Sequence, residues 1–215
     1  MDNNSSDETF KINESWEKIL NPSILKDNLI SISLYIMTFE LLKDKIETMV
    51  DDFYEVKYIG KDKKYKEEYE KSVLSLVSKK EKTHYITASL RWLISMNVLN
   101  VEDEKTYNIL REYRNDLTHE FQNFLIDSNI NFNVENMKLL ADLFSRLEKQ
   151  WIIEFEIPLN PDYDNKEIKI EETTSMQIIM LQLIYDIALN NEPEELYYSK
   201  FYESLNKKKM NFRKI

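Results

Sequence analysis

The sequence predicts an all-α protein, an up-and-down helical bundle with additional C-terminal helices. One observation is that the 215 residues include a single glycine, Gly60, whereas β-rich folds need many turn residues that accept positive φ. Another is that apolar residues recur at helical spacing in successive segments of the chain. Hydrophobic residues at 42 % and charged residues at 32 % are typical of a globular chain.

The first helix is expected over 22–58, because Asn21 and Pro22 match an N-cap followed by proline at the first helical position. A second helix is expected to end near Ser78, with one apolar face made by Tyr65, Tyr69, Val73, Leu76 and Val77. A third is expected over 83–98. Its end is marked by Asn97 and Asn100.

The spacing of Asn100 and Asp103 resembles a capping arrangement for a fourth helix over 101–126, which contains no helix breaker. Asn133 predicts the N-cap of a further helix that continues past Trp151 into the sequence IIEFEI. That end could be a strand. Two more helices complete the prediction, at 174–189 and 194–205.

We expect a disordered tail over 1–12, a helical bundle over 13–157, and a basic tail over 207–215. The loop and C-terminal helices at 158–206 are expected to pack on the same domain. The start of the chain, MDNNSSDETF, is acidic and polar, unlike a signal peptide, and no window approaches 18 uninterrupted apolar residues. A cytoplasmic protein without membrane contacts is therefore expected.

Composition also argues against several kinds of site. The scarcity of glycine removes the phosphate-cradling loops of P-loop and dinucleotide-binding proteins. There is no cysteine, and the two histidines are His84 and His119, so neither thiol chemistry nor a histidine-rich metal centre is expected. We expect no cofactor and no metal. The net charge of −10 means that any nucleic acid would be held by local cations against the overall field.

The fourth helix contains the sequence RNDLTH, in which Asn115 follows Arg114 and His119 comes four residues later. On a helical wheel one apolar seam is expected to face the protomer's own core: Leu110, Tyr113, Leu117, Phe121 and Phe124. Asn115 and His119 lie on the opposite side, so His119 is not expected in the core. Ile126 falls on that polar side and indicates a second contact surface. Arg114 lies about 140° from His119, so the two meet only if the arginine bends, the helix deviates or a second chain contributes.

An arginine, a small polar residue, three more residues and a histidine in a helical chain resemble the motif of the HEPN superfamily. The resemblance covers mainly residues 22–128 and implies a bundle of the HEPN type. In HEPN ribonucleases, two protomers join their motif helices in a homodimer and form a composite, metal-independent RNA-cleaving site. Carried across, Arg114 would grip the scissile phosphate, His119 would move protons and Asn115 would orient them. The expected product carries a 2′,3′-cyclic phosphate.

The resemblance implies an endoribonuclease of a toxin or phage-defence kind, with an RNA substrate and a possible cognate inhibitor protein. In one HEPN subgroup a companion nucleotidyltransferase modifies a tyrosine two residues after the histidine, but this chain has Phe121 there. One alternative is a catalytically inactive HEPN-like module that binds nucleotide, RNA or a protein. Another is an oligomeric scaffold in which Arg114 and His119 pair across the dimer.

Overall fold

The computed structural model describes four ranges: residues 15–54, 63–78, 85–163 and 173–189. Within these ranges the regular structure is helical and there is no strand, which confirms the predicted all-α class. No helix in them combines the length and apolar content of a membrane span. Three further expectations fall outside the described residues: the tails at 1–12 and 207–215 and the helix at 194–205.

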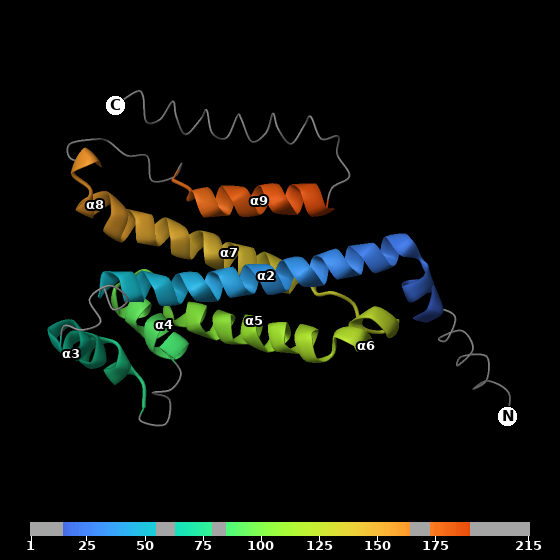
Figure 1. Ribbon diagram of the computed structural model, residues 1–215, viewed down its shortest axis with the longest axis horizontal. Helices are drawn as coiled ribbons and strands as arrows, with labels where there is room; N and C mark the ends of the chain where they lie inside the picture. The colour runs from blue at the N-terminus through green and yellow to red at the C-terminus, as the bar shows by residue number, and fades with distance from the viewer. Residues whose placement is uncertain (1–14, 55–62, 79–84, 164–172, 190–215) are drawn as a thin grey trace. The chain divides into compact units, whose positions relative to one another are not determined.

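The described α-helices follow one another along the chain (Figure 1). They are α2 (Pro22–Phe53), α3 (Lys63–Ser72), α4 (Tyr85–Ser95), α5 (Val101–His119), α6 (Phe121–Ile126), α7 (Val134–Trp151), α8 (Ile157–Leu159) and α9 (Met176–Leu189). Residues 15–20 form an additional helical segment before α2. Short segments of other helix types are the 3₁₀ turns η1 (Leu74–Leu76) and η3 (Pro161–Tyr163) and the π-helix η2 (Ile152–Glu156).

The chain divides into two compact units, and each is described by itself. Unit 1 comprises Met1–Met37, Arg111–Lys138 and Met176–Ile215. Unit 2 comprises Thr38–Leu110 and Leu139–Ser175. The helices α2, α5 and α7 each contribute residues to both units.

In unit 1 an aromatic cluster surrounds Tyr113, which lies on α5. Its ring meets that of Tyr35 edge-on with centroids 5.0 Å apart, and Phe124 and Phe132 lie 6.2 and 6.1 Å from it. The hydroxyl of Tyr113 accepts a hydrogen bond of 2.7 Å from the backbone N–H of Asn133. The cluster therefore joins the end of α5 to α6 and to the start of α7 by both ring contacts and a hydrogen bond.

The helical segment 15–20 is fixed within unit 1 by Lys18. Its buried ammonium donates to the backbone carbonyls of Asp127, at 2.8 Å, and Ile130. Burial lowers the pKa of Lys18, and the neighbouring charge of Asp127 partly opposes this effect. The carbonyl of Asp127, the C-cap residue of α6, and that of Ile130, in the loop that follows, thus accept from a side chain from another part of the chain.

Unit 2 has an aromatic core and two ion pairs that involve buried carboxylates. The indole N–H of Trp92 donates to the hydroxyl of Tyr54 at 3.0 Å. Phe155 contacts Trp92 and stacks on Trp151 with centroids 4.4 Å apart. The ion pairs are Lys45 with Glu148 at 3.0 Å and Arg146 with Asp103 at 2.7 Å.

The predicted helix starts are confirmed by their capping hydrogen bonds. Asn21 Oδ1 accepts from the backbone N–H of Ser23 at 3.1 Å, and Asn133 Oδ1 accepts from that of Asn136 at 3.1 Å. At the start of α5 the predicted pair is reciprocal: Asp103 N–H donates to Asn100 Oδ1 at 3.1 Å, and Asn100 N–H donates to Asp103 Oδ2 at 2.9 Å.

The predicted helix ends agree with the structure less well than the predicted starts. After α4, Asn97 adopts a φ of 59°, the left-handed conformation that stops a helix, as expected. The second helix was expected to reach Ser78, but α3 ends at Ser72 and a 3₁₀ turn follows. The hydroxyl of Ser75 donates to the carbonyl of Lys71 there, a side-chain bond that competes with regular helical bonding.

The prediction of a possible strand in IIEFEI is wrong, because this segment is the π-helix η2. Pro158 follows it and has no N–H, so the helical bond to the carbonyl four residues earlier cannot form. Instead the N–H of Ile157 bonds to the carbonyl of Ile152, five residues earlier. The wider turn carries Phe155, which is 9 % exposed and stacks on Trp151.

The prediction of one uninterrupted helix over 101–126 is also wrong. Helix α5 ends at His119, and Glu120 separates it from α6 with φ −103° and ψ 21°. The break contains neither glycine nor proline. Its cost is reduced because Asn123 Nδ2 donates to Glu120 Oε2 at 2.5 Å and Phe124 N–H still bonds to the carbonyl of Glu120.

Candidate functional site

The helix that carries the motif is held by the apolar seam that the sequence predicted. Leu110 and Leu117 are completely buried and Phe124 is 9 % exposed. Tyr113 and Phe121 are half-buried. Because Leu117 lies between Asn115 and His119 in sequence, its burial fixes which way the motif residues face.

Arg114 and Asn115 are joined directly. The guanidinium Nη1 of Arg114 donates to the side-chain Oδ1 of Asn115 at 3.2 Å, and both residues are half-buried. The backbone carbonyl of Arg114 also accepts a hydrogen bond of 2.9 Å from the hydroxyl of Thr118. With its oxygen occupied by Arg114, Asn115 retains its two amide N–H groups as donors.

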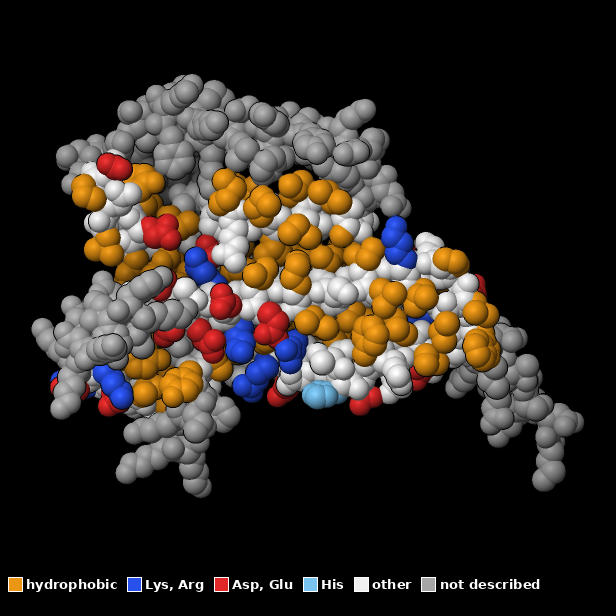
Figure 2. Space-filling view, viewed as in Figure 1, with side chains coloured by type: hydrophobic (Ala, Val, Ile, Leu, Met, Phe, Trp, Pro, Cys, Tyr) orange, Lys and Arg blue, Asp and Glu red, His pale blue; other side chains and the backbone are white. Residues whose placement is uncertain are grey.

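His119 is the last residue of α5 and its side chain is exposed. It makes no side-chain hydrogen bond or ion pair with any residue in the described ranges. Figure 2 shows this histidine, the one histidine among the described residues, at the molecular surface. The imidazole is therefore accessible to a ligand, and the prediction that it lies outside the core is confirmed.

The described chain does not bring Arg114 and His119 together. Helix α5 is α-helical from Val101 to His119, so the separation of about 140° around its axis holds for these two residues. No hydrogen bond connects the two side chains in the described part of the chain. A site that uses both heads on one phosphate needs a bent arginine or a second chain.

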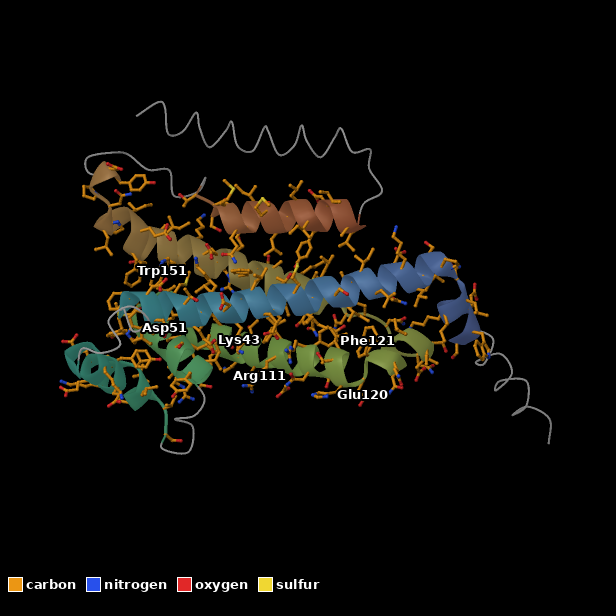
Figure 3. The ribbon with its side chains drawn as sticks, in the orientation of Figure 1. Lys43, Asp51, Arg111, Glu120, Phe121 and Trp151 are labelled. Carbon is orange, nitrogen blue, oxygen red and sulfur yellow. The ribbon has the colours of Figure 1, made fainter. Side chains whose placement is uncertain are left out.

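The break after His119 changes the interpretation of the residues beyond it. Ile126 was placed on the polar side of α5 by continuing one wheel, and that continuation fails at Glu120 (Figure 3). Ile126 is nevertheless 48 % exposed on α6. Its exposure keeps it available for contact, but its position relative to His119 no longer follows from the wheel.

Arg111 is a further cation on this helix, four residues before Asn115. Its side chain is half-buried and makes no hydrogen bond or ion pair with any described residue. Figure 3 shows Arg111 on α5, and the spacing of four residues places it about one helical turn before Asn115. The carboxylates of Glu112 and Asp116 are exposed on the same helix, so the local charge is mixed.

Neighbouring titratable groups respond to burial. Burial raises the pKa of Tyr113, the hydrogen bond from the Asn133 backbone lowers it, and the charge of Asp116 raises it further. Burial also raises the pKa of Tyr35, with Tyr113 and Tyr185 adding to the effect. Both hydroxyls therefore stay neutral at physiological pH, and that of Tyr113 accepts the structural hydrogen bond from Asn133.

Comparisons of the chain with protein-family models, with curated proteins and with solved structures find no match. Within the described ranges no three histidine or acidic residues are grouped so that they could hold a metal ion. The functional interpretation therefore depends on the motif residues of α5 and on the way that this helix presents them.

Proposed function

We propose that this protein is a metal-independent endoribonuclease of the HEPN type, acting in a toxin or phage-defence role. The observation that carries the proposal is the arrangement on α5, where Asn115 holds the guanidinium of Arg114 and the exposed imidazole of His119 ends the same helix. The all-α fold is compatible with the helical bundle of the HEPN superfamily, whose motif this sequence resembles. RNA is the substrate, and a cognate inhibitor protein is a possible partner.

In the proposed reaction the ribose 2′-hydroxyl attacks the adjacent phosphorus. The bond from phosphorus to the 5′-oxygen breaks, which leaves a 2′,3′-cyclic phosphate and a 5′-hydroxyl. An imidazole suits the two proton transfers, from the attacking hydroxyl and to the leaving oxygen, because it exchanges protons near neutral pH. Arg114 stabilises the extra negative charge on the phosphate oxygens in the transition state. Asn115 positions Arg114.

The proposed active species is a homodimer that joins through α5. One chain presents Arg114 and His119 on different sides of the helix. In the proposed dimer the arginine of one copy lies near the histidine of the other, and the two-fold axis makes this contact occur twice. Two imidazoles would then be available, one for each proton transfer.

The experiment is RNA cleavage in excess EDTA by the wild type, Arg114→Ala and His119→Gln. His84→Gln is the matched control, because it removes the other histidine of the chain. We expect cleavage by the wild type and by the control, termini with 2′,3′-cyclic phosphate, and a loss of at least 100-fold in both motif variants, the scale of one general acid or base. Equal cleavage by all four proteins would indicate a contaminating nuclease and contradict the proposal.

Sedimentation of the same proteins tests the dimer. A wild type that is monomeric at all concentrations would contradict the composite site. A dimer that binds RNA without cutting it would favour the inactive HEPN-like module. Dissociation of the dimer by Arg114→Ala, in a protein without nuclease activity, would favour the scaffold in which the two residues pair.

A further inference from the structure

The polar face of α5 carries a row of three residues that the motif alone does not define. Arg111, Asn115 and His119 are spaced four residues apart, so they lie within about 80° of one another around the helix axis. Arg114, the arginine of the motif, lies outside this row, about 140° from His119. Arg111 and Asn115 therefore share a face with His119, and so does the exposed Glu112, seven residues before His119 and about 20° from it around the axis.

The row offers hydrogen-bond donors to a ligand. The oxygen of Asn115 accepts from Arg114, and its two N–H groups are donors for a ligand. The side chain of Arg111 has only donors, and neither the Arg111 nor the His119 side chain forms a hydrogen bond or ion pair within the described ranges. The donors of this row fit an anion whose oxygens only accept, as phosphate oxygens do, and the exposed carboxylates of Glu112 and Asp116 beside the row oppose that anion.

The length of the row indicates more than one phosphate. Eight residues of α-helix separate the Cα atoms of Arg111 and His119 by about 12 Å. Hydrogen bonds to one phosphate need donor-to-oxygen distances near 3 Å, and an imidazole stays close to its own helical turn. A phosphate at His119 therefore leaves Arg111 facing the adjoining part of the nucleic acid backbone.

We propose that Arg111 binds a phosphate next to the scissile one, so that the site takes single-stranded RNA with at least two consecutive phosphates. The inference rests on the proposed function, because it places the RNA on the face that carries His119. Arg111 then acts as a substrate-binding residue, and Asn115 lies between the two phosphates as a donor. A dinucleotide with one phosphate would occupy only part of this face.

The test measures binding of a 12-nucleotide RNA that cannot be cut because its scissile position carries a 2′-deoxy sugar. Wild type, Arg111→Gln and Lys105→Gln are compared by fluorescence anisotropy. Lys105 is the matched control: it lies on α5, is exposed and pairs only with the exposed Glu102. We expect Arg111→Gln to weaken binding about 10-fold, as for one charge-assisted contact, and to reduce the salt slope by about one. Equal effects of both variants would overturn the inference.

A second measurement identifies the phosphate. Methylphosphonate replaces the flanking phosphates one at a time and removes their charge. One replacement should weaken binding to the wild type about 10-fold but have little further effect on Arg111→Gln. If every replacement weakens both proteins alike, Arg111 contacts none of them and the inference is wrong.

These results separate the two proposals. A wild type that binds the RNA with the expected dependence on Arg111, but cuts no substrate, contradicts the nuclease and supports the binding face. A wild type that cuts RNA with no dependence on Arg111 contradicts the binding face and supports the nuclease.

Discussion

The Oδ1 atom of Asn115 accepts a hydrogen bond from the guanidinium of its sequence neighbour Arg114, at 3.2 Å. Successive residues of a helix point about 100° apart, so this bond draws the arginine head toward the polar face of α5. Both side chains are half-buried, which limits the competition from water. The small polar residue of the motif thus has a physical role as the positioning residue for the arginine.

Replacing Asn115 by alanine should therefore lower RNA cleavage without unfolding the protein. We expect a fall in kcat/KM of about 10-fold, the cost of one charge-assisted hydrogen bond. The loss should appear chiefly in kcat if the guanidinium acts in the transition state. Single-turnover kinetics in EDTA, with circular dichroism to check folding, would measure it. Unchanged kinetics would show that Asn115 does not position Arg114.

Leu117→Ala should destabilise the protein strongly. Its side chain is completely buried beneath the motif, and truncation of a buried leucine to alanine costs about 2 to 5 kcal/mol. Thr118→Ala is the matched control, because Thr118 is exposed and its hydroxyl bonds only to the carbonyl of Arg114. Urea unfolding of the two variants measures the difference. A similar, small loss in both would show that Leu117 does not anchor α5.

Much of this fold follows from local sequence signals. The capping residues Asn21, Asn100 and Asn133 were predicted correctly because an N-cap bond joins atoms only two or three residues apart. The end of α4 at Asn97 follows from the tolerance of asparagine for left-handed φ. The apolar seam of α5 follows from its period.

The wrong predictions concern the type of secondary structure in one segment and the end of a helix in another, which local sequence signals do not decide. The π-helix at Ile152–Glu156 combines apolar and acidic residues that also suit a strand, and it is favoured by Pro158 and by the stacking of Phe155. The break at Glu120 has no glycine or proline to mark it. The role of Arg111 was not predicted, because its place in a row with His119 depends on the regular geometry of α5.

The pairing of Asp103 with Arg146 should contribute modestly to stability. The Asp103 side chain is 5 % exposed and its partner is 52 % exposed, with 2.7 Å between Nη2 and Oδ1. Solvent screens such a pair, so a double-mutant cycle with Asp103→Asn and Arg146→Gln should give a coupling energy of about 1 kcal/mol. The same cycle for Lys105 and Glu102, both largely exposed, should give less. Equal couplings would show that burial of Asp103 adds nothing.

Ionisation of Tyr69 should lower the stability of the folded protein in alkaline solution. Burial, and next the charge of Asp51, raises the pKa of Tyr69 from 10.0 to about 12. The folded state then holds the phenolic proton more tightly than the unfolded chain, so this stabilisation is complete below pH 10 and is lost between pH 10 and 12. Relative to wild type, Tyr69→Phe should gain stability across that window in urea unfolding. Tyr163→Phe is the control, and an identical pH profile for all three proteins would contradict the assignment.

Asp116→Asn should increase the affinity for RNA. Asp116 is exposed on α5, about 60° around the axis from His119, and its charge opposes an anionic backbone at the proposed face. Removing an exposed like charge should strengthen binding about 2- to 5-fold at 50 mM salt and less at 200 mM, because ions screen the repulsion. Asp27→Asn on α2, also exposed, removes the same charge and is the matched control. If both variants strengthen binding equally, the effect comes from net charge rather than from this face of α5, and the RNA lies elsewhere.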